Sequence, residues 1–190
     1  MNSHILLFAN KIDLDVIGAM SSFVTPFGVK VALFVSNIGS PYSFLLLAIA
    51  AVMIFWLYKK PYYLIQFIVT LGVGYLSVYV LKILIAKPRP VAALIQVGGY
   101  SFPSGHATVA TLFCSLLIFA YKDHIKNVFL RLLFIIILSI SALAISFSRV
   151  YLSVHYLSDV VVGIILGLLI SSLSVFIFEN FFRKKELNID

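Results

Sequence analysis

Residues 148–159 read SRVYLSVHYLSD, and this segment joins two long stretches without a charged residue. One stretch lies between Arg131 and Arg149, and the other lies between Asp159 and Glu179. Each approaches the roughly 20 apolar residues that a helix needs to cross about 30 Å of hydrocarbon. The segment therefore predicts a turn between two membrane-spanning helices. Its polar side chains would then lie at one face of the membrane.

The composition of the whole chain also indicates a membrane protein. The 190 residues are 62% hydrophobic and 11% charged, and the mean hydropathy is +1.11. Because a soluble domain has about 25% charged residues, an ordinary water-soluble globule is excluded. The single cysteine, Cys114, excludes a disulfide framework and a cysteine-based metal site, and is expected to be a small buried apolar residue. The net charge of +7 is better explained by a membrane than by nucleic acid.

The charge-free windows predict a single all-α membrane domain, a polytopic helix bundle. Its five spans lie at about 43–58, 62–82, 105–121, 130–148 and 157–178. Residues 1–42 lack a full window, because Lys11, Asp13, Asp15 and Lys30 interrupt their apolar pieces, and we expect interfacial helices there. A sixth span at 17–38 is the alternative. The predicted organisation is an interfacial segment 1–42, a membrane domain 43–182 and a basic tail 183–190.

Positive charges are distributed unequally between the two predicted membrane faces. Because lysine and arginine favour cytoplasmic loops, we assign the richer face to the cytoplasm; it holds Lys59, Lys60, Lys122, Lys126, Arg131, Arg183, Lys184 and Lys185. The other face holds Lys11, Lys30, Lys82, Lys87, Arg89 and Arg149. The same topology brings the polar ends of four spans to this outer face. Six side chains are thus expected to meet there: Lys82, Arg89, His106, Arg149, His155 and Asp159.

The residue types in this cluster favour binding of an anion. Three cations (Lys82, Arg89 and Arg149) face a single carboxylate, Asp159, and guanidinium groups give the paired planar donors that suit phosphate. Pro103-Ser104 predicts a helix start with Ser104 as N-cap, and Gly105 leaves the free N–H groups accessible to an anion. Each feature also has a structural interpretation. The cations could be interfacial anchors, and a histidine near a helix start is often structural.

The two histidines add reactive groups to this site. His155 and Asp159 are four residues apart and are expected on one helix face, where the carboxylate would fix the imidazole tautomer. His155 could then act as a nucleophile, and His106 as a general acid. Arg149 precedes His155 by six residues, which is about 240° around a continuous helix. We therefore expect the chain to turn around 152–154.

Together these residues resemble the three-part signature of the type 2 phosphatidic acid phosphatase superfamily of membrane lipid phosphatases. The first part is KILIAKPRP, with Lys82, Arg89 and Pro90. The second is PSGH, residues 103–106. The third is SRVYLSVHYLSD, with Ser148, Arg149, His155 and Asp159. The resemblance covers 43–180, and the linked order and spacing of the three parts make it specific.

The resemblance implies a phosphatase that uses no metal and no cofactor. It implies that His155 attacks phosphorus and forms a phosphohistidine, that His106 protonates the leaving group and that Asp159 orients His155. The phosphoryl oxygens would be held by Lys82, Arg89, Ser104, Gly105 and Arg149. Soluble vanadate-dependent haloperoxidases share these motifs, but five hydrophobic spans argue against that activity.

The resemblance also implies a phosphorylated membrane lipid as substrate, with the lipid bilayer as the surroundings, no nucleic acid and no obligate protein partner. A short chain with five spans is similar to the bacterial branch that converts undecaprenyl diphosphate to undecaprenyl phosphate, for recycling of the cell-wall lipid carrier. Phosphatidylglycerophosphate, phosphatidic acid and lipid A phosphate are alternatives. The expected location is the bacterial plasma membrane, with the active site facing the periplasm.

Two other functional classes and two structural features remain open. A transporter or channel would place ionisable residues through the membrane midplane, whereas here they cluster at span ends; a non-enzymatic lipid-binding protein is the other class. The loop 90–102, PVAALIQVGGYSF, either dips into the headgroup layer or merely connects two helices. Gly163 and Gly167 form a small-xxx-small pair, which favours close helix packing inside the monomer over dimerisation.

Overall fold

The computed structural model describes residues 3–57 and 61–183, and throughout these ranges the regular structure is helical. The main helices are α1 (Ser3–Phe23), α2 (Pro26–Ile38), α3 (Pro41–Leu57), α4 (Pro61–Ile85), α5 (Gly105–Tyr121), α6 (Val128–Tyr151) and α7 (Leu157–Ile177). Two short helices follow α5 and α7, at Lys122–His124 and Phe178–Arg183. The all-α prediction is confirmed. The predicted tail lies outside the described residues beyond Arg183, as do Lys59 and Lys60.

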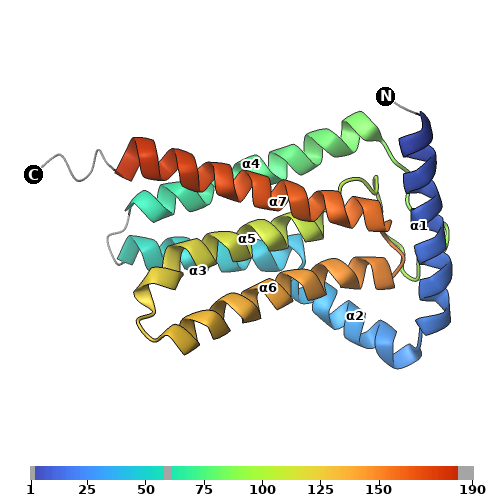
Figure 1. Ribbon diagram of the computed structural model, residues 1–190, viewed down its shortest axis with the longest axis horizontal. Coiled ribbons are helices and arrows are strands. Elements are labelled where there is room, and N and C mark those ends of the chain that lie inside the picture. Colours follow the sequence, from blue (N-terminus) through green and yellow to red (C-terminus); the bar gives the residue numbers. More distant parts are fainter. Residues whose placement is uncertain (1–2, 58–60, 184–190) are drawn as a thin grey trace, which may run out of the picture.

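Helices α3 to α7 lie side by side along the long axis, and α1 lies across one end of this bundle (Figure 1). The loop between α4 and α5 and the turn between α6 and α7 are at the same end. Helix α5 is central, because it packs against α3, α4, α6 and α7. The polar motifs of the sequence are therefore gathered at one end of the bundle, beneath an N-terminal helix.

Four helical segments are long and apolar enough to cross a membrane: Tyr62–Ile85, Gly105–His124, Val128–Tyr151 and Leu157–Phe181. They correspond to four of the five predicted spans. Helix α3 fills the fifth window with 17 residues, and its crossing of the membrane stays a prediction. The segment 17–38 is divided between α1 and α2, because Thr25 caps a new helix that begins at Pro26. The surface location of α1 and α2 likewise stays a prediction.

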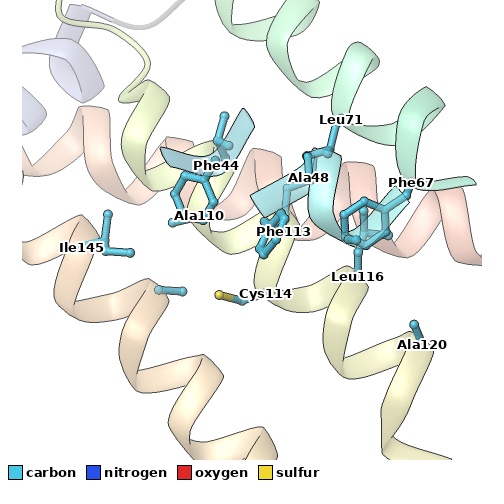
Figure 2. Packing of buried hydrophobic residues seen from close by; sticks show 14 residues of the cluster. Phe44, Ala48, Phe67, Leu71, Ala110, Phe113, Cys114, Leu116, Ala120 and Ile145 are labelled. Atoms are coloured by element: carbon cyan, nitrogen blue, oxygen red, sulfur yellow. The ribbon is translucent and has the colours of Figure 1, made fainter. Parts of the chain in front are cut away.

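The outer surface of the bundle is apolar, as expected for helices in contact with lipid. Leu76, Ile140 and Leu169 are each 60% exposed or more. Aromatic side chains pack in the interior (Figure 2). The centroid of the Phe113 ring lies 5.2 Å from that of the Phe44 ring and 5.5 Å from that of the Phe67 ring. Cys114 is buried in this cluster as a free thiol. The prediction of a small buried apolar residue is confirmed.

Gly163 and Gly167 allow α7 to approach α5 closely. A Cβ atom on Gly163 would lie 2.9 Å from the Ser104 carbonyl oxygen, and one on Gly167 would lie 2.7 Å from that of Thr108. Both contacts are within the chain, in agreement with the packing interpretation. The close approach also brings the starts of the two helices together, since the Ser104 N–H donates to the Asp159 carbonyl at 3.0 Å.

The loop between α4 and α5 packs onto the turn between α6 and α7. The Leu94 N–H donates to the Leu152 carbonyl at 3.0 Å, and the apolar side chains of Ala93, Ile95 and Val97 pack around Leu152 and Val154. The loop is thus more than a connector, because it forms part of the packed end of the bundle. Whether it also enters the headgroup layer stays a prediction.

Candidate active site

Six of the eight predicted site residues line one cavity of about 230 Å³ at this end of the bundle. The lining is Tyr75, Val78, Lys82, Arg89, Val97, Gly105, His106, Val109, Arg149 and His155. The other two predicted residues, Ser104 and Asp159, are fully buried and contribute through their contacts. The residues come from α4, α5, α6, the long loop and the α6–α7 turn. The convergence expected from the topology is therefore observed.

Lys82 and Arg89 are held in place by backbone carbonyls of the loop. Helix α4 continues to Ile85, so that Lys82 lies in its last turn, and its Nζ donates to the Tyr100 carbonyl at 2.6 Å. Ala86, with φ of 48°, then turns the chain sharply, a left-handed conformation that costs energy for a residue with a Cβ. Arg89 Nε donates to the Gly99 carbonyl at 3.1 Å, and Nη1 donates to that of Val154 at 2.8 Å.

Arg149 is a buried guanidinium with an unused donor. It lies in the last turn of α6, is 4% exposed, and its Nη1 donates to Ser36 Oγ of α2. Its Nε has no hydrogen-bond partner in the described structure. A buried charge with an unpaired donor is costly unless a ligand completes it. Because Arg149 also lines the cavity, this favours an anion as the occupant.

His155 lies in the turn and not on α7, which corrects the expectation that it shares a helix face with Asp159. Helix α7 begins at Leu157 with Tyr156 as its N-cap, and the preceding turn contains Ser153 with φ of 51°. The predicted turn around 152–154 is confirmed. The turn brings the two side chains together without a helix, since His155 Nδ1 is 3.5 Å from Asp159 Oδ2. A four-residue spacing places two side chains on one face only within a helix, and His155 precedes the start of α7.

The contacts of His155 define its tautomer. Its Nε2 lies 3.2 Å from Arg89 Nη1, and because a guanidinium only donates, Nε2 must accept. The proton of the neutral ring is then on Nδ1, which faces Asp159. Burial lowers the pKa of His155 to about 4, against the opposing hydrogen bond to Asp159 and with a smaller lowering by the charge of Arg89. The imidazole is therefore neutral at pH 7, with a lone pair on Nε2.

His106 also lines the cavity, from the first turn of α5. Ser104 is the N-cap of this helix, as predicted, and its Oγ accepts from the Ala107 N–H at 3.5 Å. Gly105 also lines the cavity, and a Cβ there would meet Val78 only at 3.5 Å, an ordinary contact. The start of α5, where N–H groups and the positive end of the helix dipole favour anions, is therefore part of the cavity wall.

The charges around the cavity are unbalanced toward the positive. Lys82, Arg89 and Arg149 line it, and among the described residues of the lining there is no carboxylate. Asp159 is directed elsewhere: its Oδ1 accepts from Lys87 Nζ at 2.9 Å and its Oδ2 accepts from the Tyr156 N–H at 3.0 Å. The cavity thus combines three cations, a helix start and two imidazoles, which suits a phosphoryl group that is bound and transferred.

Three residues around the site are not predicted from the sequence. Lys87 was counted only as an outer-face cation, yet its Nζ binds Asp13, Ser158 and Asp159. Asp13 was placed in an interfacial segment without a role. Ser36, which binds Arg149, was not considered. The position of Lys87 within KILIAKPRP was a usable signal, but nothing in the spacing identified its partners.

Fold and site together define a helical membrane protein with a cavity lined by three cations and two histidines. The family model described as the PAP2 superfamily matches residues 63–183. The chain belongs to this superfamily, which confirms the resemblance drawn from its three motifs.

The chain is similar to two relatives and, in fold, to one more distant structure. Phosphatidylglycerophosphatase B of Bacillus subtilis (strain 168) is 35% identical over 136 residues, which cover 66% of this chain and 62% of that protein, less than two thirds of its length. A crystal structure of a transmembrane PAP2 type phosphatidylglycerolphosphate phosphatase from Bacillus subtilis has a TM-score of 0.82 and 27% identity, and covers 94% of each chain. A crystal structure of Aquifex aeolicus LpxE shows the same fold, with a TM-score of 0.69 and 22% identity. The match covers 85% of this chain and 93% of that chain.

Proposed function

We propose that this protein is an integral membrane lipid phosphatase that transfers a phosphoryl group to His155 and then to water. One observation carries the proposal. Three cations and two histidines line a single cavity, and its lining within residues 3–57 and 61–183 includes no carboxylate. Such a site binds a dianionic phosphate and offers both a nucleophile and a proton donor. The membrane domain that carries it corresponds to residues 43–182.

In the first proposed step, Nε2 of His155 attacks phosphorus. Lys82, Arg89, Arg149, the Ser104 hydroxyl and the N–H of Gly105 hold the phosphoryl oxygens. A bond forms between nitrogen and phosphorus while the bond from phosphorus to the lipid oxygen breaks, and the electron pair goes to that oxygen. His106 gives it a proton. Asp159 stabilises the positive imidazole through Nδ1, and Arg89 exchanges its contact with Nε2 for one with a phosphoryl oxygen.

In the second proposed step, water attacks the phosphohistidine. His106, now without its proton, accepts one from the water, and the nitrogen–phosphorus bond breaks. Inorganic phosphate leaves, and His155 regains its lone pair. The three fixed cations would supply the positive charge that metal ions provide in other phosphoryl-transfer enzymes, which supports a metal-independent reaction.

We propose two leading substrates, phosphatidylglycerophosphate and undecaprenyl diphosphate. The names of the two Bacillus subtilis relatives support the first. The predicted five-span plan, of which four candidate spans are present, supports the second, which would serve recycling of the cell-wall lipid carrier. Both carry a terminal phosphate, so the same cavity suits either. Phosphatidic acid and lipid A phosphate remain further candidates.

A phosphate-release panel tests this proposal. Purified wild-type protein in detergent is given undecaprenyl diphosphate, phosphatidylglycerophosphate, phosphatidic acid and lipid A, and inorganic phosphate is measured over time. We expect turnover of at least one lipid, and the ranking of initial rates identifies the substrate. Binding without release from all four lipids would favour a non-enzymatic lipid-binding protein. Lipid flux into proteoliposomes without phosphate release would favour a transporter.

We further propose that the site faces the outside of a bacterial plasma membrane. Single cysteines at Val91 and Lys126 test this, since Val91 is fully exposed in the loop beside the site and Lys126 is exposed in the α5–α6 connection. The native Cys114 is buried and gives a low background. In intact cells an impermeant thiol reagent should label Val91→Cys and spare Lys126→Cys. The reverse labelling pattern would invert the proposed topology.

A further inference from the structure

Helix α1 carries one buried carboxylate, and this group is directed at the active site. Asp13 is 2% exposed, whereas its neighbour Leu14 is 65% exposed. Its Oδ1 accepts from the Ser158 N–H at 2.9 Å, and its Oδ2 accepts from Ser158 Oγ at 2.6 Å. The Ser158 N–H belongs to the first turn of α7, where N–H groups lack a partner within the helix. A residue 145 positions earlier in the sequence thus caps the helix that carries Asp159.

Lys87 connects this carboxylate to the one beside His155. Its Nζ donates to Asp13 Oδ2 at 3.0 Å, to Ser158 Oγ at 2.9 Å and to Asp159 Oδ1 at 2.9 Å. An ammonium group has three donors, so all of them are used. The same Nζ lies 4.1 Å from the centre of the Tyr156 ring, which adds a cation–π contact. Lys87 does not line the cavity, so it is not a phosphate ligand in this arrangement.

We propose that Asp13 and Lys87 are positioning residues, through which the N-terminal helix α1 forms part of the active site. This inference rests on the proposed phosphatase function. Lys87 holds Oδ1 of Asp159, and this fixes the carboxylate so that Oδ2 stays toward Nδ1 of His155. Asp13 holds Lys87 and the first turn of α7 in place. Neither residue touches the phosphoryl group.

The positive charge of Lys87 offsets part of the negative charge of the two carboxylates that it contacts, Asp13 and Asp159. A partly buried ammonium shared between two carboxylates leaves one net negative charge, so Asp159 is partly neutralised while it remains an acceptor. Without Lys87, the full charge of Asp159 would act on His155 at 3.5 Å and stabilise its protonated form. The other titratable and charged groups facing His155 are Lys82, Arg89, His106 and Arg149. They stay unchanged in a Lys87 variant.

The test compares two neutralising substitutions with matched controls. Asp13→Asn is paired with Asp15→Asn, an exposed carboxylate on the same helix, and Lys87→Met is paired with Lys126→Met, an exposed lysine at the far end. Lys87→Arg restores a cation. For the lipid with the highest wild-type rate, kcat, KM and the pH profile of kcat/KM are measured, together with the melting temperature in detergent.

We expect kcat of Lys87→Met to fall about 10- to 100-fold, the usual effect of removing a group that orients a catalytic ligand. KM should change by less than about threefold, because no substrate contact is lost. The acid limb of the profile should move to higher pH, and Lys87→Arg should recover most of kcat. Asp13→Asn should show a smaller loss of kcat in the same direction, and both controls should match the wild type.

Two results would overturn this inference. One is unchanged kcat in both Asp13→Asn and Lys87→Met. The other is a loss of activity that matches the loss of folded protein, with an unchanged pH profile and no recovery of kcat in Lys87→Arg. That combination would show that Asp13 and Lys87 only stabilise the fold. A wild type that releases no phosphate from any lipid would instead refute the proposed function, so the two failures are distinguishable.

Discussion

Arg89 Nη1 lies 3.2 Å from Nε2 of His155, and the same Nη1 donates to the carbonyl of Val154 at 2.8 Å. One guanidinium thus holds both the side chain and the backbone next to the proposed nucleophile. Because arginine cannot accept a hydrogen bond, this contact requires a neutral His155 with its proton on Nδ1. The cation that would bind phosphate therefore also prepares the tautomer that attacks it.

The pH dependence should reveal this neutral histidine. Protonation removes the lone pair of His155, so kcat/KM should fall only as the pH falls toward the lowered pKa of about 4, not near the ordinary value of about 6.5. Folding should respond with the same sign: the unfolded chain binds the proton first, so stability declines as the pH drops from about 6.5 toward 4.

The measurement is kcat/KM between pH 4 and 8, with correction for titration of the substrate phosphate at about pH 6. His124→Asn is the matched control, because this exposed histidine lies in the connection after α5, away from the cavity. An acid limb near pH 6.5 that is present in the wild type and persists in His124→Asn would contradict the lowered pKa of His155.

Replacing Arg149 should separate activity from stability. Arg149→Met removes a buried guanidinium whose Nε has no partner, so the melting temperature should stay equal or rise, as in other replacements of buried charges by apolar groups. Activity should nevertheless fall by at least about 10- to 100-fold, which corresponds to the loss of one hydrogen bond between charged groups.

Phosphate release and thermal unfolding in detergent check the Arg149 prediction, with Arg131→Met near the other end of α6 as the control. Equal activity in Arg149→Met and Arg131→Met would show that the buried guanidinium is not a phosphate ligand.

The dependence on His106 should differ between the two leading substrates. The leaving group of phosphatidylglycerophosphate is an alkoxide, which needs a proton. The leaving group of undecaprenyl diphosphate is undecaprenyl phosphate, which is a much weaker base. His106→Ala should therefore lose about 100- to 10,000-fold in kcat on the first lipid and clearly less on the second. Parallel rates on both lipids provide the measurement. Equal losses would indicate that His106 binds or orients the phosphate without protonating the leaving group.

The close contact of α7 with α5 should make Gly167 intolerant of a side chain. Its Cβ would lie 2.7 Å from a backbone oxygen, so Gly167→Ala should lower the free energy of unfolding by about 1–3 kcal/mol, the cost of overpacking. Gly72→Ala is the matched control on α4, where a Cβ meets nothing within 4 Å, and alanine should be neutral or stabilising. Thermal unfolding of both variants in detergent measures the difference, and similar melting temperatures would argue against the packing role.

The sequence predicted those parts of the fold that depend on local pattern. The α5 boundaries, the Ser104 cap and the turn before α7 follow from charge-free windows, capping chemistry and helix geometry. The convergence of the site residues followed from counting membrane crossings. These features depend on the distance between residues along the chain, and that distance can be read from the sequence.

The parts that could not be predicted depend on how helices pack. Hydrophobic windows do not define which face of α1 turns inward, so the burial of Asp13 and its contact with Ser158 were invisible. The same applies to Ser36 on α2 and its partner Arg149. The misplacement of His155 on α7 has a different cause, since the backbone leaves the helix within SRVYLSVHYLSD and a spacing of four residues is compatible with a turn.

The central claim, that His155 carries phosphoryl transfer, is tested most directly by phosphate release from His155→Ala. Wild type and variant are compared on the best lipid of the panel, at equal amounts of folded protein. We predict that release by His155→Ala falls to the background rate while the variant remains folded. Full activity in folded His155→Ala would contradict the account.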